Sequence, residues 1–133
     1  MNTYTQPTNL TLIGTKVTNF PSGIQSAFQK LGVTLGTNRA FYGVSWMDEH
    51  NNIVYFTMAA EAFPGEGDRY QYERLIMEKG EYRTESLHNW MSQTDCIKDI
   101  FQRLMRSDKP GKDHPCIEWY QSLDKMLCMI RNK

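Results

Sequence analysis

The segment "HPCIEWYQS" places a carboxylate among apolar and aromatic residues that are typical of a strand. Side chains alternate along a strand, so Cys116, Glu118 and Tyr120 share one face, and Ile117 and Trp119 point to the other. A carboxylate removed from water is costly unless it is paired, and burial raises its pKa. Glu118, with Tyr120 beside it, is therefore suited to binding a cation or to acid–base chemistry.

Two environments for Glu118 are open at this point. In the first, the carboxylate lies in an apolar hollow and pairs with a ligand. In the second, Glu118 lies on a solvated face of the sheet and pairs with Lys125 across a hairpin. Because unpaired glutamate is rarely buried, the residue pattern alone favours the second environment.

Other reactive residues form no recognisable site. The cysteines are odd in number and have no C-x-x-C spacing, and the histidines lie at no metal-ligand spacing from a cysteine or a carboxylate. These residues are Cys96, Cys116, Cys128, His50, His88 and His114. The chain also lacks G-x-S-x-G and a phosphate-binding glycine loop. We expect no metal and no cofactor, and any catalysis would use Glu118 with a tyrosine.

The composition indicates one neutral domain. The chain has 133 residues and a formal net charge of zero, which lacks the basic surface that nucleic-acid binding requires. Its first residues, "MNTYTQPTNLTLIG", have no signal-peptide pattern, and no apolar stretch is long enough to span a membrane. We therefore expect a cytoplasmic protein that contacts neither nucleic acid nor membrane directly.

Two segments have the apolar periodicity of amphipathic helices. In "PSGIQSAFQKLG", Ser22 and Gln25 form a capping-box pattern, and Gly32 indicates an interruption or the C-terminal end. In "SQTDCIKDIFQRLMRS", Ser92 and Asp95 have the same capping spacing. The apolar positions of the two helices are Ile24, Phe28, Leu31 and Leu35, and Ile97, Phe101 and Leu104.

The remaining segments predict strands. "NLTLIGTKVTNF" and "YQYERLIMEKGEYRTESLHNW" each read as one strand, bent near Gly14 and Gly80 respectively. "NRAFYGVSWMDEHNNIVYFTMAAEAFPGEG" predicts a hairpin that turns at "DEHNN". "DKPGKD" predicts a loop, and "PCIEWYQSLDKMLCMIRNK" a hairpin that turns around residues 122–124.

This order suggests a duplicated unit. Strand, helix, strand and strand occur twice, and the apolar positions of the helices match at an offset of 73 residues. The repeats would span about 8–64 and 70–133; two unrelated amphipathic helices are the alternative. We therefore predict an α+β fold, a tandem βαββ repeat with a mostly antiparallel sheet and two helices on one face. A ligand groove is expected at the pseudo-twofold junction, because concave sites collect where substructures meet.

The run "GEY" at 80–82, a helix, a loop and "PCIEWY" at 115–120 together resemble the GyrI-like small-molecule-binding domain. That family includes DNA gyrase inhibitory proteins and the effector-binding domains of certain AraC-type and MerR-type transcription regulators. Its motif, a glutamate in a strand followed by an apolar residue and a tyrosine, corresponds to Glu118, Trp119 and Tyr120.

The resemblance covers the whole chain in the order of its elements, although the specific residues lie mostly in 75–121. "FYGVSW" at 41–46 also looks like the first hairpin of the family. Regulators of this type join the domain to a helix-turn-helix module, for which this sequence has no residues. The resemblance therefore implies a free-standing binding domain.

The resemblance further implies that Glu118 lies in an aromatic pocket and faces organic cations. Tyr120 belongs beside it by strand alternation. The other candidate ligand-binding residues are Tyr42, Trp46, Phe56, Tyr82 and Trp90. The sequence does not decide whether Tyr55 or Phe56 faces the pocket, and each aromatic residue taken singly is more often a core residue.

We therefore predict a protein that binds small hydrophobic, cationic molecules, as a stand-alone sensor or a sequestering protein. Two alternatives are a glutamate-dependent hydrolase of small electrophilic compounds and a protein inhibitor of the DNA gyrase inhibitory type. A homodimer or a protein partner that receives a signal is left open. None of these functions requires a cofactor.

Overall fold

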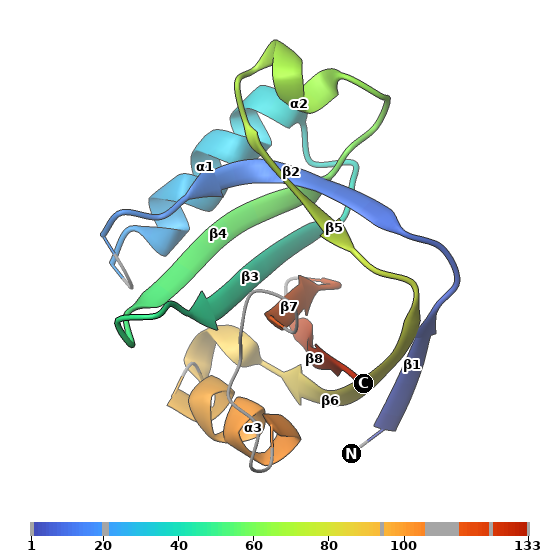
Figure 1. Cartoon of the computed structure of the whole chain (residues 1–133). Coiled ribbons are helices and arrows are strands. Elements are labelled where there is room, and N and C mark those ends of the chain that lie inside the picture. Colours follow the sequence, from blue (N-terminus) through green and yellow to red (C-terminus); the bar gives the residue numbers. More distant parts are fainter. Residues whose placement is uncertain (1, 20–21, 94, 106–114, 123, 133) are drawn as a thin grey trace.

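In the part of the chain that the structure describes, eight strands form one antiparallel sheet in the order β1-β6-β8-β7-β3-β4-β2-β5. They are β1 (Asn2–Gln6), β2 (Leu10–Lys16), β3 (Phe41–Met47), β4 (Ile53–Ala60), β5 (Glu73–Met77), β6 (Gly80–His88), β7 (Cys116–Tyr120) and β8 (Lys125–Arg131). The helices are α1 (Ile24–Leu35), α2 (Glu66–Arg69), the 3-10 helix η1 (Trp90–Ser92) and α3 (Asp95–Met105). The sheet curls into a half-barrel (Figure 1), which confirms the predicted α+β class. This computed structural model describes residues 2–19, 22–93, 95–105, 115–122 and 124–132.

The strand order is symmetric about its centre, where β3 pairs with β7. On one side follow β4 and β2, and on the other β8 and β6. The order agrees with two units of strand, helix, strand and strand, β2-α1-β3-β4 and β6-α3-β7-β8. The repeat bounds of 8–64 and 70–133 stay a prediction from the sequence.

The two outer strands cross between these units. β1 precedes β2 in the chain but pairs with β6, whereas β5 precedes β6 but pairs with β2. The sequence predicted no strand over 2–6 and a single bent strand over 70–90. It was wrong on both points. Residues 2–6 form a strand through their pairing with β6. The segment 70–90 divides because Gly80 begins a separate strand at φ 131°, a conformation that residues other than glycine rarely adopt.

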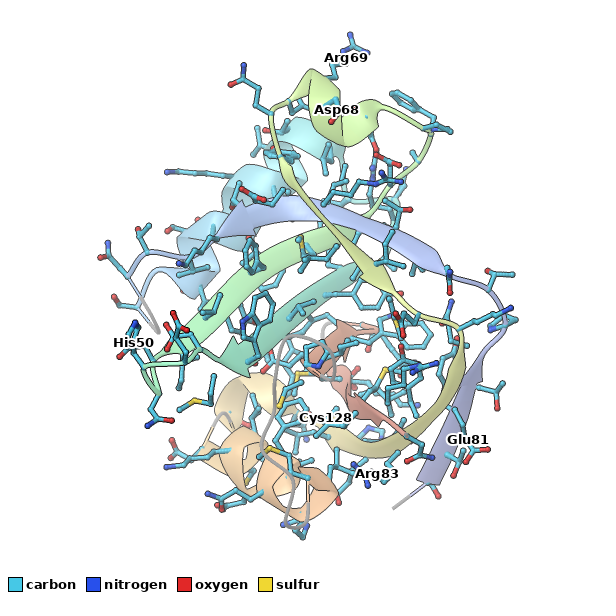
Figure 2. All side chains as sticks on the ribbon, in the orientation of Figure 1. His50, Asp68, Arg69, Glu81, Arg83 and Cys128 are labelled. Carbon is cyan, nitrogen blue, oxygen red and sulfur yellow. The ribbon has the colours of Figure 1, made fainter. Side chains whose placement is uncertain are left out.

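Each face of the sheet has its own apolar core. We call the face that carries Glu118 the helix face, because α1 contacts it through Phe28 and α3 through Leu104. Figure 2 shows Cys128 between the sheet and α3. The opposite, concave face carries a second core, built on Leu12, Tyr42, Val44, Phe56, Met58, Met77, Tyr82, Ile117 and Met129.

The ends of the helices differ from the prediction. The hydroxyl of Ser22 donates to the Asn19 carbonyl at 3.4 Å, and Gly23 takes the N-cap of α1. Ser92 likewise donates to the Asn89 carbonyl, at 3.0 Å. A capping hydroxyl must instead accept from a backbone N–H, so neither predicted capping box forms. The C-cap of α1 is Gly36, whose N–H bonds to the carbonyl of Gly32.

The predicted first hairpin is confirmed, and its turn is held by a side chain. Asp48 Oδ1 accepts the backbone N–H groups of His50 and Asn52, both at 2.9 Å. The hairpin of β7 and β8 is also present, although residue 123 of its turn is outside the described part of the chain. The predicted loop at 108–113 is outside it as well.

Candidate functional site

Glu118 lies on β7 at the centre of the helix face and is only 8% exposed. Its neighbours in register are Gly43 on β3 and Cys128 on β8. Lys125, the partner proposed for a solvated glutamate, pairs in register with His88 instead. The structure therefore excludes the solvated environment and makes Glu118 a buried carboxylate.

Two tyrosine hydroxyls hold the Glu118 carboxylate. Tyr55 donates to Oε1 at 2.5 Å, and Tyr120 donates to the same oxygen at 2.7 Å. The two hydroxyl oxygens are 3.3 Å apart. Within the described part of the chain, Oε2 accepts no hydrogen bond. One carboxylate oxygen is thus fixed in place, and the other is left for a further partner.

The absence of a side chain at Gly43 makes this arrangement feasible. A Cβ at this position would lie 2.0 Å from the hydroxyl of Tyr55 and 2.4 Å from Oε1 of Glu118. Both distances are far below van der Waals contact. The glycine of "FYGVSW" therefore provides the space in which the tyrosine of one strand reaches the glutamate of another.

Burial raises the pKa of Glu118, and the hydrogen bonds from Tyr55 and Tyr120 offset part of this effect because they favour the charged form. The pKa of both tyrosines is raised well above the usual range, first by burial and then by the nearby glutamate charge. Burial also raises the pKa of Cys116 to about 12, so this neighbouring thiol is unsuited to nucleophilic chemistry. In the unliganded protein, the neutral form of the glutamate is thus favoured relative to a carboxyl in water.

Aromatic rings from two other elements surround Tyr120. The ring of Phe28, on α1, packs edge-on with centroids 5.2 Å apart, and the ring of Trp90, on η1, lies at 4.9 Å. The indole N–H of Trp90 donates to the Ser122 carbonyl at 3.4 Å. The site thus combines residues of the central strands with Phe28 of α1 and with Trp90, which precedes α3.

The predicted ligand-binding residues divide between the two faces of the sheet. Tyr120 and Trp90 lie on the helix face, with Glu118. The other four lie on the concave face, where Tyr42 stacks on Trp119 with centroids 6.0 Å apart. These four are Tyr42, Trp46, Phe56 and Tyr82. They cannot join Glu118 in one recognition unit, because a layer of sheet separates them from it.

The sequence left open whether Tyr55 or Phe56 faces the site, and it did not identify Phe28 as a site residue. Tyr55 pairs in register with Ser45, and Phe56 with Val44, so Tyr55 is the one that faces Glu118. The register of the first hairpin was the signal that could have decided this. Phe28 was assigned only to the apolar stripe of its helix, which the sequence does not connect to the last strand.

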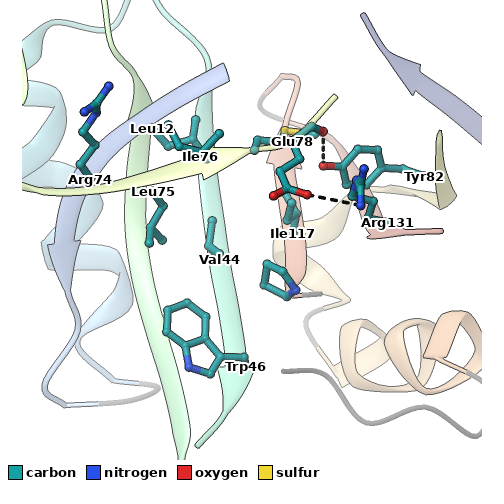
Figure 3. Close-up of a pocket in the computed structure, with 12 residues that line it drawn as sticks. Leu12, Val44, Trp46, Arg74, Leu75, Ile76, Glu78, Tyr82, Ile117 and Arg131 are labelled. Carbon is teal, nitrogen blue, oxygen red and sulfur yellow. Dashed lines mark hydrogen bonds and ion pairs between the residues drawn. The ribbon is translucent and has the colours of Figure 1, made fainter. Parts of the chain in front are cut away.

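A hollow lies on the concave face and has a volume of about 230 Å³ (Figure 3). An ion pair between Arg131 and Glu78, 3.3 Å long, stands at one side of it. The described residues that line the hollow are Leu12, Val44, Trp46, Arg74, Leu75, Ile76, Met77, Glu78, Tyr82, Pro115, Ile117 and Arg131. We call it the concave cavity.

The described residues contain no group of three or more histidine, cysteine, aspartate or glutamate side chains that could hold a metal ion. Nor does any helix in the described ranges have the length and apolar character needed to cross a membrane.

Comparison with protein-family models and with curated proteins gives no match. Solved structures do match along the whole chain. An integron cassette protein from the mobile metagenome of Vibrio cholerae has a TM-score of 0.66 at 14% identity, with 100% of both chains covered.

Two further solved structures share the fold. A protein bound to tetraphenylphosphonium has a TM-score of 0.56 at 14% identity, covering 99% of this chain and 95% of that one. A candidate bacterial transcription regulation protein from Staphylococcus aureus MU50 has a TM-score of 0.56 at 12% identity, with 99% of each chain covered. The chain is therefore similar in fold, over its full length, to these three proteins.

Proposed function

We propose that this chain is a GyrI-like domain that binds small, hydrophobic organic cations beside Glu118. The observation that carries the proposal is a buried carboxylate with one oxygen held by Tyr55 and Tyr120 and the other without a described partner. The rings of Phe28 and Trp90 lie against Tyr120. The protein acts as a sensor or a sequestering protein.

The physical basis is compensation of a buried charge. Burial favours the neutral form of Glu118, and a bound cation restores the charged form because it attracts the carboxylate in a medium of low dielectric constant. Aromatic faces around the cation add about 0.5 to 2 kcal/mol each through their quadrupoles. A hydrated inorganic ion gains less, since it must leave its water shell to reach an apolar site.

The fold comparisons support this proposal in a general way. One protein of the same fold was solved with tetraphenylphosphonium, a lipophilic cation, and another is a candidate transcription regulation protein. Both sequences are far from this one, so the proposal depends on the local geometry at Glu118.

The test is a binding measurement with two ions of the same shape and opposite charge. Isothermal titration calorimetry should show binding of tetraphenylphosphonium to the wild type and little binding of tetraphenylborate. Glu118→Gln removes the charge while keeping the shape, and we expect it to weaken tetraphenylphosphonium binding by about tenfold or more. Glu49→Gln, in an exposed turn, is the matched control and should bind as the wild type does. Equal affinity of Glu118→Gln and wild type would contradict the proposal.

Hydrolysis of a small electrophilic compound is the second candidate, and the same geometry favours it. The unoccupied oxygen of Glu118 is a nucleophile or general base, and the hydroxyls of Tyr55 and Tyr120 are adjacent proton donors. Turnover of an activated ester that is lost in Glu118→Gln and retained in Glu49→Gln would support an enzyme. Ester hydrolysis no faster than in buffer would leave cation capture as the function.

A further inference from the structure

We propose that the concave cavity is a second ligand site and that it takes neutral compounds of one or two rings. The inference does not rest on the proposed cation site. Val44 and Ile117 line the cavity, whereas their chain neighbours Gly43 and Glu118 face the opposite side of the same two strands. A ligand in the cavity would therefore lie back to back with Glu118, behind a single layer of sheet.

The volume of the cavity limits the size of the ligand. It measures about 230 Å³. An engineered apolar cavity of about 150 Å³ binds benzene, and pockets for drug-sized ligands have volumes of about 300 Å³ or more. A single substituted ring or a fused pair of rings fits between these limits.

The walls favour an apolar, planar ligand. Leu12, Val44, Leu75 and Ile117 provide aliphatic contacts. Trp46 adds a flat aromatic surface, and its ring is braced by stacking on Phe56 with centroids 5.5 Å apart and planes 20° from parallel. A rigid aromatic wall of this kind binds another ring with little loss of conformational entropy.

Three polar side chains at the cavity, Arg131, Glu78 and Tyr82, are already paired, which favours a neutral ligand. Arg131 bonds to the Glu78 carboxylate and, through Nε and Nη2, to the Lys79 carbonyl. The Tyr82 hydroxyl donates to the Glu78 carbonyl at 2.6 Å. The Arg74 side chain extends away from the other lining residues (Figure 3). A charged ligand would lose its hydration without gaining an unpaired counter-charge, so the site selects against ions.

The test uses quinoline and N-methylquinolinium, which share a ring system and differ in charge at neutral pH. Calorimetry should show that quinoline binds wild type and Glu118→Gln with equal affinity. N-methylquinolinium should show no binding to Glu118→Gln, because the concave cavity selects against ions, and binding to this variant as tight as that of quinoline would contradict the selection for neutral ligands. Failure of quinoline to bind the wild type would overturn this proposal without affecting the tetraphenylphosphonium result.

A cavity-filling variant locates the site. Leu75 is half-buried on the edge strand β5 and points into the cavity, so a larger side chain there fills the space without disturbing the central strands. Leu75→Trp should weaken quinoline binding by about tenfold or more while tetraphenylphosphonium binding stays unchanged, which also reports that the variant is folded. Leu75→Met keeps the volume and should bind quinoline as the wild type does. Quinoline binding that survives in Leu75→Trp would overturn the proposal.

Discussion

At the scale of single residues, the most unusual feature is a carboxylate that lies in a core without a cationic partner among the described residues. Glu118 is tolerated there because Tyr55 and Tyr120 both donate to it. These neutral donors satisfy one oxygen but leave the desolvation cost of the charge largely uncompensated. The cost is what a cationic ligand would relieve, so two measurements on single residues follow.

The first measurement is the pH dependence of stability. Folding raises the pKa of Glu118 above its ordinary value of 4.5, so the folded state binds a proton that the unfolded state has released. The free energy of unfolding must then fall as pH rises from about 4.5 to the raised folded value, and each unit of this shift costs about 1.4 kcal/mol. Urea denaturation of wild type and Glu118→Gln should show the wild type losing stability relative to the variant across this window.

The control for this experiment is Glu49→Gln, whose carboxylate is 86% exposed. Its unfolding free energy should follow that of the wild type at every pH. If wild type and Glu118→Gln gave parallel curves, the carboxyl group would not be desolvated as the structure indicates.

The second measurement concerns Gly43. Gly43→Ala would force Tyr55 and Glu118 to move, because the new Cβ overlaps both. We expect a loss of about 1 to 3 kcal/mol in the free energy of unfolding, the usual cost of overpacking, together with weaker tetraphenylphosphonium binding. Denaturation and calorimetry on the same sample check both effects. Unchanged stability and affinity would show that this close contact has no role.

At the scale of elements, α1 contains a glycine, Gly32, whose replacement should stabilise the protein. Gly32 was predicted to interrupt or end the helix, but α1 continues to Leu35 and is capped by Gly36. The space around Gly32 is open, since an added Cβ would meet only Thr37 Cγ2 at 3.7 Å. The residue therefore costs helix propensity and gains no close packing.

Gly32→Ala should accordingly stabilise the protein by about 0.5 to 1 kcal/mol, because alanine restricts the unfolded chain and favours the helix. Thermal or urea denaturation measures this change. The variant is also the matched control for Gly43→Ala, since the same substitution is expected to act in the opposite direction. Destabilisation by Gly32→Ala would mean that α1 does not run through this position.

At the scale of the whole molecule, the two edge strands, β1 and β5, each pair with the half of the sheet that is formed by the other part of the chain. β1 is an edge strand that pairs with β6, and Tyr4 lies opposite Tyr82 in this pairing. The ring of Tyr4 packs against that of Trp119, with centroids 5.5 Å apart. The first strand of the chain therefore pairs with the second unit and covers part of the concave-face core. This arrangement predicts that the start of the chain contributes to global stability and is not a dispensable tail.

Tyr4→Ala tests this point. Loss of the ring contact and of the buried area should lower the free energy of unfolding by about 2 to 4 kcal/mol. Thr3→Ala and Thr5→Ala, at exposed positions of the same strand, should change it by less than about 0.5 kcal/mol. A Tyr4→Ala variant as stable as these two controls would indicate that β1 does not contribute to the core.

The sequence by itself determined what depends on near neighbours along the chain. Apolar periodicity predicted both long helices, the turn residues predicted the first hairpin, and strand alternation placed Glu118 and Tyr120 on one face. These patterns arise from the fixed geometry of helix and strand, which each segment carries within itself. The fold class followed from the order of the elements.

Only the tertiary structure decided which distant residues meet. Burial of Glu118, its bond to Tyr55, and the division of the predicted aromatic residues between two faces all depend on the register between strands far apart in sequence. A shift of one residue in that register would exchange Tyr55 for Phe56, and no local pattern records the difference. The sequence also did not predict that β1 pairs with β6 and β5 with β2. Each strand could pair with several others, and the choice depends on the packing of the whole sheet.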